Sequence, residues 1–134
     1  MELQVYLLTL VYLLIGSSIL LSQRYSSRFN LLLDLQNVYS KNRKMKLFLA
    51  IIGIVLLFGL IFYPISPGPI ILGDLLEIIN IFCLSFYYFF CYFQTEESVP
   101  ITEYGIKAKA KIIFGWEILI VVVLHFLFPS IVLI

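Results

Sequence analysis

The sequence predicts an all-α integral membrane protein with four transmembrane helices and one short helix on the membrane surface. Hydrophobic residues make up 62% of the 134 residues and charged residues only 13%, a composition outside the usual range of soluble domains. Four apolar stretches reach or approach the roughly 20 residues that a helix needs to cross a bilayer. These stretches are residues 3–21, 47–63, 70–93 and 112–134, and residues 1–134 are interpreted as a single membrane domain.

The basic residues predict how the spans are oriented. All the Lys and Arg residues lie either after the first span or before the fourth: Arg24, Arg28, Lys41, Arg43, Lys44, Lys46, Lys107, Lys109 and Lys111. Basic loops stay on the cytoplasmic or matrix side, so both segments are expected there and both termini on the outer side. The turn at residues 64–69 carries no Lys or Arg and is rich in Pro, which fits the outer side.

Residues 28–40 are predicted to form a helix that lies on the inner membrane surface. Apolar residues such as Phe29 and Leu32 alternate there with polar ones such as Asp34 at roughly helical spacing. Two interpretations stay open. The segment either anchors the topology through its basic neighbours alone, or lines the entrance to a site at membrane level.

Glu117 calls for an explanation because it lies about six residues inside the apolar run that follows Lys111. A carboxylate at such a place costs roughly 2.5 to 3.5 kcal/mol on insertion scales unless it faces a partner, water or a proton path. One interpretation is that the side chain reaches back to the inner surface beside Lys111. The other is that it faces a partner or a proton path inside the membrane.

Three more ionisable residues lie in or beside the spans. Asp74 and Glu77 open the third span on one helix face, where carboxylates complement the helix dipole and reach outer water. The alternative is that they form the outer end of a proton route. His125 lies eight residues beyond Glu117, about 12 Å along a helix, so the two are not expected to touch. We expect a neutral imidazole that is hydrogen-bonded to a neighbouring helix.

The sequence contains no metal-ligand spacing, no glycine-rich phosphate loop and no cluster of Cys and His. We therefore expect no metal, no cofactor bound by this chain and no nucleic-acid partner. Cys83 and Cys91 are eight positions apart on one span, too far to bridge each other, and are expected to be buried free thiols.

Gly105 opens a short basic segment, and an aromatic-glutamate pair, Trp116 and Glu117, follows with the glutamate twelve positions after the glycine. This pattern resembles subunit 1 of respiratory complex I, the quinone-chamber subunit of proton-pumping NADH:ubiquinone oxidoreductase, in which a glycine opens a small basic helix and an aromatic-glutamate pair follows. Near the surface helix, Asp34 and Lys41 fall on the family's matching positions. The resemblance covers roughly residues 24–125, about the N-terminal half of the family's usual length, so a separate chain is expected to carry the rest.

This resemblance implies a subunit of a proton-translocating NADH:ubiquinone reductase that is not catalytic alone. It would help to form the quinone chamber and the start of the proton path, with ubiquinone as the substrate of the complex. The implied site residues are Glu117 as a proton carrier, Asp34, Lys41, Arg24 and Arg28 at the quinone chamber, and Asp74 and Glu77 on a possible proton path.

The resemblance also implies partners and a location. The partners would be membrane lipid, the chain with the C-terminal half of the same subunit, and the other complex I subunits of the quinone module and membrane arm. The expected location is the mitochondrial inner membrane, with a bacterial cytoplasmic membrane as the alternative.

Two other classes of function stay open. The chain could be a non-catalytic accessory subunit of another membrane complex, in which Glu117 pairs with a neighbour to fix helix register. It could also be a small oligomeric channel or transporter, with a path lined by Asp74, Glu77, Glu117 and His125. Ion flux through the purified chain in liposomes separates the channel from the subunit interpretations.

Overall fold

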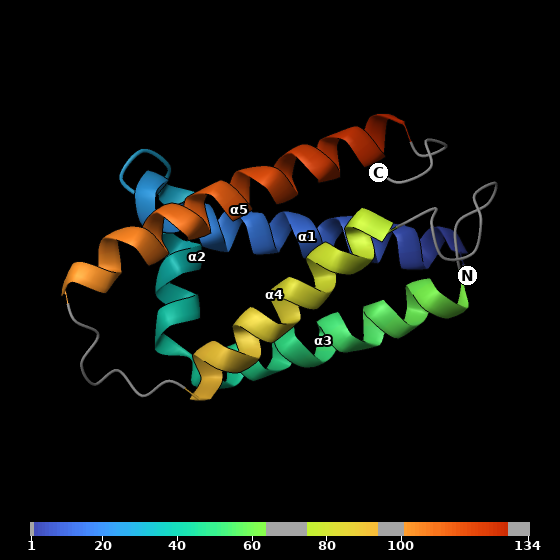
Figure 1. The fold of residues 1–134 in the computed structure, drawn as a ribbon, viewed down its shortest axis with the longest axis horizontal. Helices are drawn as coiled ribbons and strands as arrows, with labels where there is room; N and C mark the ends of the chain where they lie inside the picture. The colour runs from blue at the N-terminus through green and yellow to red at the C-terminus, as the bar shows by residue number, and fades with distance from the viewer. Residues whose placement is uncertain (1, 64–74, 94–100, 129–134) are drawn as a thin grey trace.

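The computed structural model describes residues 2–63, 75–93 and 101–128. Within these residues the chain forms only helices, and Figure 1 shows their arrangement. The helices are α1 (Glu2–Tyr25), α2 (Asn30–Lys41), α3 (Arg43–Phe62), α4 (Leu75–Phe93) and α5 (Ile101–Leu127). The predicted all-α fold class is confirmed.

Four of these helices are long and apolar enough to cross a membrane. Their candidate spans are Leu3–Ser22, Arg43–Phe62, Leu75–Phe93 and Ala108–Leu127. The third helix begins at Arg43 rather than at residue 47, because flexible basic side chains can continue a helix while their charges stay in water. Residues 64–74 and 129–134, which include the predicted hairpin and parts of two predicted spans, lie outside the described residues.

The bundle is built from two pairs of helices. Helix α1 packs along α5, and α3 packs along α4, while α2 lies across one end of both pairs (Figure 1). We call this end the basic end: α1 and α4 end there, α3 and α5 begin there, and the described Lys and Arg residues lie there. The other end is called the opposite end.

Helix α2 is the surface helix that the sequence predicts. It begins after Phe29 and ends before Asn42, both of which have extended backbone conformations. None of its residues is fully buried, although Leu35 and Tyr39 pack partly against the core. Leu31 is 75% exposed, so α2 also presents apolar surface away from the bundle, as a helix at a membrane interface does.

Most of the buried side chains of the bundle are apolar. Leu13, Ile81, Leu84 and Ile118 are completely buried, whereas large Phe side chains such as Phe82 cover the outside, as expected for surface that faces lipid.

Gly53 leaves room on α3 for side chains from two neighbouring helices. A Cβ atom at this position would overlap the Ser85 hydroxyl and the Tyr12 hydroxyl. Small residues let membrane helices approach closely, so Gly53 sets how near α3 lies to α1 and α4.

Candidate functional site

Helix α4 carries a buried polar stripe formed by Glu77, Asn80, Ser85 and Tyr88. The exposed fractions of these residues are 0%, 2%, 6% and 0%, respectively. Their spacing of three, eight and eleven positions from Glu77 places them on one face of the helix. That face points into the bundle, while Phe82 and Phe86 on the same helix are exposed. The interior of the bundle therefore contains polar groups that lipid could not solvate.

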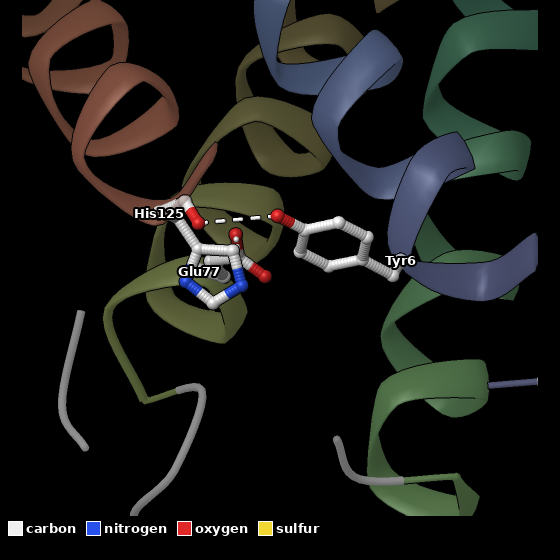
Figure 2. Close-up of polar contacts among 3 residues, drawn as sticks. All are labelled: Tyr6, Glu77 and His125. Atoms are coloured by element: carbon white, nitrogen blue, oxygen red, sulfur yellow. Dashed lines mark hydrogen bonds and ion pairs between the residues drawn. The ribbon is translucent and has the colours of Figure 1, made fainter. Parts of the chain in front are cut away.

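Glu77 and His125 form an acid-base pair between α4 and α5 (Figure 2). Glu77 Oε1 lies 3.3 Å from His125 Nε2, and the two side chains are 0% and 1% exposed. Nearby, the Tyr6 hydroxyl of α1 donates to the His125 carbonyl oxygen at 3.1 Å. Three helices thus meet near the opposite end, around two groups that can exchange a proton.

The interpretation in which Glu77 reaches outer water is wrong. Glu77 does lie in the first turn of α4, where it complements the helix dipole, but its side chain is completely buried. The carboxylate is turned inward because His125 meets it there. His125 has the contact with a neighbouring helix that we expected, and Glu77 supplies it. Asp74 lies outside the described residues.

Glu117 faces Asn80 across the same junction. The Asn80 side-chain amide donates to Glu117 Oε1 at 3.3 Å, and the second carboxylate oxygen of Glu117 is buried. Lys111, toward which Glu117 might have reached back, instead places its ammonium 5.5 Å from the centre of the Tyr87 ring. Glu117 is therefore held in the middle of its span by a partner on α4.

Hydroxyl groups continue the stripe toward the basic end. The Tyr12 hydroxyl donates to the Leu49 carbonyl at 3.1 Å and lies 3.4 Å from Ser85 Oγ. The Tyr12 and Tyr88 rings meet edge to face with centroids 6.3 Å apart. These contacts join α1, α3 and α4, so the polar groups run along much of the bundle.

Some buried polar atoms of this interior have no hydrogen-bond partner among the described residues: Thr9 Oγ1, the Tyr88 hydroxyl oxygen and Glu117 Oε2. Thr9 is three positions from both Tyr6 and Tyr12 on α1, so it lies on the same helix face. Buried polar groups are nearly always hydrogen-bonded, often to water. These atoms could therefore form hydrogen bonds with water molecules inside the bundle.

The other predicted site residues do not join this interior. Asp34 and Lys41 are exposed on α2, and Arg24 and Arg28 are exposed around the end of α1. They lie at the basic end and are not part of the Glu77–His125 cluster. Whether they border a quinone chamber stays a prediction.

Two further expectations concern cysteines and metals. Cys83 is exposed and Cys91 is partly buried, so the expectation of two buried thiols is wrong, because α4 turns its polar stripe rather than Cys83 inward. Among the described residues no three His, Cys, Asp or Glu side chains gather as metal ligands would.

Asn80 and the hydroxyl groups of Ser85 and Tyr12, which accompany the charged residues, were missed in the sequence analysis. A signal was present, because Glu77, Asn80, Ser85 and Tyr88 recur at helical spacing in an otherwise apolar span. In a membrane helix, polar residues that share a face indicate the face that packs against protein.

The comparisons with known proteins give a family and no function. No curated protein and no solved structure matches the chain. A model of an uncharacterised protein family matches residues 1–125, which is nearly the whole chain. The chain therefore belongs to this uncharacterised family.

Proposed function

We propose that this chain is a membrane-embedded subunit that carries protons along the junction between α4 and α5. The observation that supports this most directly is the Glu77–His125 pair, in which an acid and a base lie 3.3 Å apart with almost no exposure. Ionisable residues inside membrane helices commonly mark proton relays. Because the two side chains are in contact, a proton that moves from one to the other travels only a short distance, and the charge within the bundle is displaced little.

The two nitrogens of the imidazole allow a proton to pass through the ring. When His125 accepts a proton at Nδ1, it can release another from Nε2 to Glu77 Oε1, which is its neighbour. The ring is then neutral again and the carboxyl is protonated, so one proton has advanced through the histidine. Release from Glu77 toward the opposite end restores the carboxylate, and the imidazole must then move its remaining proton from Nδ1 back to Nε2, by ring rotation or through a water, before the next transfer.

Glu117 supplies the second proton carrier of this proposal. It lies eight positions from His125 on α5, about 12 Å along the helix, so water or hydroxyl groups must connect the two. The buried oxygens of Thr9 and Tyr88 offer hydrogen-bonding positions beside this junction. Asn80 holds one oxygen of Glu117 and leaves the other for such a contact.

Proton flux into liposomes tests the proposal. The purified chain is reconstituted around a pH-sensitive dye, a membrane potential is imposed, and internal pH is followed. Glu77→Gln and Glu117→Gln keep the side-chain size and remove the titrating proton, so each is expected to slow flux at least tenfold. Lys44→Gln, which removes an exposed charge outside the junction, is the control and is expected to leave flux unchanged.

The accessory-subunit interpretation gives a different result. If the two pairs only fix helix register, the Gln variants retain hydrogen bonding and proton movement does not depend on them. Where the chain conducts only within an assembly, the same variants are measured in source membranes by the pumping of that assembly. Unchanged flux and unchanged pumping would reject the proton-carrier proposal.

The complex I resemblance names one assembly in which this proposal would operate. The chain would form the N-terminal half of the quinone-chamber subunit, with ubiquinone as substrate and the C-terminal half on another chain. The stretch from Gly105 to Glu117 and the position of α2 across the basic end support this setting. The family match names no activity, so membership in complex I and the organelle membrane stay predictions.

Blue-native electrophoresis of source membranes followed by mass spectrometry tests this setting separately. The chain is expected to migrate with NADH dehydrogenase activity and with other complex I subunits. A chain found outside any such complex would reject the setting, while the flux measurement still decides whether Glu77 and Glu117 carry protons.

A further inference from the structure

A second polar site lies at the basic end, away from the Glu77–His125 pair. It is a cavity of about 200 Å³ to which all five helices contribute. The polar part of its lining comes from Ser22, Gln36, Tyr39, Ser40, Lys46, Tyr87 and Lys111. The cavity thus forms where the surface helix α2 meets the ends of the four spans.

Two lysines from different helix pairs face this cavity. Lys46 belongs to α3, and its ammonium lies 5.3 Å from the centre of the Tyr39 ring. Lys111 belongs to α5, and its ammonium lies 5.5 Å from the centre of the Tyr87 ring. Both lysines are only partly exposed, and the aromatic contacts hold the charges near the cavity.

The cavity is positive and has no acidic lining residue. Among the residues that the structure describes, neither lysine has a carboxylate at ion-pair distance. Burial raises the pKa of the Tyr39 phenol, so the hydroxyl stays protonated and can donate a hydrogen bond. Gln36 adds amide hydrogens, and the site therefore combines two cations with neutral donors.

We propose that this cavity binds the phosphate group of an anionic lipid headgroup. Two ammonium groups and a phenol hydroxyl suit the oxygens of a phosphate, which accept charge-assisted hydrogen bonds. The volume is below the roughly 300 to 1,000 Å³ of pockets for drug-sized ligands, which favours a compact group. Basic pockets between transmembrane helices are known receptors for such headgroups.

The position of the cavity favours lipid over free phosphate. Helix α2 crosses the bundle at the level where the spans end, which is where headgroups lie (Figure 1). Leu31 and Phe48 are large exposed apolar residues on α2 and α3, next to which acyl chains can pack. A bound phosphate would join Lys46 to Lys111 and so hold the two helix pairs together at this end.

Native mass spectrometry of the purified full chain tests the proposal. The chain is released from micelles that contain phosphatidylglycerol and phosphatidylcholine in equal amounts, and the retained lipid is counted. We expect selective retention of phosphatidylglycerol, weakened roughly tenfold or more in Lys46→Gln/Lys111→Gln. The control Lys44→Gln/Lys109→Gln removes the same charge from exposed positions outside the cavity and is expected to retain the lipid.

A further variant covers the case in which the double variant fails to fold. Tyr39→Phe keeps the aromatic ring and both lysine charges of the cavity but removes one hydrogen-bond donor. This variant is expected to weaken retention of phosphatidylglycerol several-fold, while its circular dichroism spectrum stays unchanged. If the Lys44→Gln/Lys109→Gln control lost as much phosphatidylglycerol as Lys46→Gln/Lys111→Gln, retention would depend on net charge alone, and the proposed binding site would be rejected. Binding of inorganic phosphate that prevents lipid retention by the wild type would assign the cavity to free phosphate instead.

Discussion

The Asn80 amide on α4 donates to Glu117 Oε1 on α5 at 3.3 Å, so the carboxylate inside the fourth span is met by a partner on the third. This contact crosses the junction between the two helix pairs. Glu117 lies eight positions before His125 on α5, and His125 makes the second polar contact of the same junction, with Glu77. The two helix pairs are therefore linked by polar groups at more than one level of the membrane.

Removing this amide should destabilise the bundle modestly. Asn80→Leu fills similar volume but leaves Glu117 Oε1 without its donor, and we expect a loss of about 1 kcal/mol, in the range measured for hydrogen bonds between membrane helices. Reversible unfolding in mixed micelles measures it. In an Asn80→Leu background, Glu117→Leu should restore part of the loss. No difference between Asn80→Leu and the wild type would mean that this contact contributes nothing.

The Glu77–His125 pair should show strong coupling in a double-mutant cycle. His125→Leu leaves a buried carboxylate without its imidazole, and breaking such a pair typically costs about 3 to 5 kcal/mol. Glu77→Leu/His125→Leu should be less destabilised than the sum of the single variants by about 1 kcal/mol or more. The control cycle of Glu117 with His125 should be additive within about 0.5 kcal/mol. An additive Glu77–His125 cycle would contradict the pairing.

Gly53 should tolerate no side chain. Gly53→Ala places a Cβ atom against the Ser85 and Tyr12 hydroxyls, and we expect a loss of about 1 to 3 kcal/mol, as for other overpacked cores. Gly59→Ala is the matched control on the same helix, because its Cβ would meet Val5 at 3.4 Å, an ordinary contact. The control should be neutral or slightly stabilised. Equal melting temperatures for both variants would show that α3 does not approach so closely.

The basic end should face the cytoplasm or the matrix. After Cys83 and Cys91 are replaced by Ala, Ser27→Cys and Ser40→Cys provide exposed positions at that end. A membrane-impermeant maleimide applied to intact cells or mitoplasts should label neither until the membrane is permeabilised, because basic segments are retained inside. A tag at the N-terminus should be reached without permeabilisation. Labelling of Ser40→Cys from outside would show that the topology is the reverse of the predicted one.

The fold class could be predicted from the sequence because it depends on composition and length. Apolar runs of about 20 residues leave few alternatives to membrane helices, and the surface helix at residues 30–41 follows from its local periodicity. These properties are local. They do not depend on which helix lies beside which.

The site could be predicted only in part, because pairing depends on the rotation of packed helices. Glu117 could be recognised as unusual because it is a charged residue inside an apolar run, but the residues around it in the sequence did not predict that Asn80 is its partner. Glu77 and His125 are 48 positions apart, and their contact exists only because the start of α4 and the end of α5 come together near the opposite end of the bundle. The position of Glu77 near a helix N-terminus predicted that its side chain reaches outer water, whereas the packing of the helices buries it.

The pairing of α1 with α5 has a consequence for how the protein is made. Helix α1 leaves the ribosome before α5, so this pair, and with it the bundle of the described helices, cannot close until α5 has been synthesised. At roughly 5 to 20 residues per second, His125 follows Glu77 into the membrane roughly 2 to 10 seconds later. During that interval the carboxyl group of Glu77 lacks the His125 imidazole that it contacts in the folded bundle. Arrival of His125 on α5 therefore completes the internal acid-base pair of the bundle.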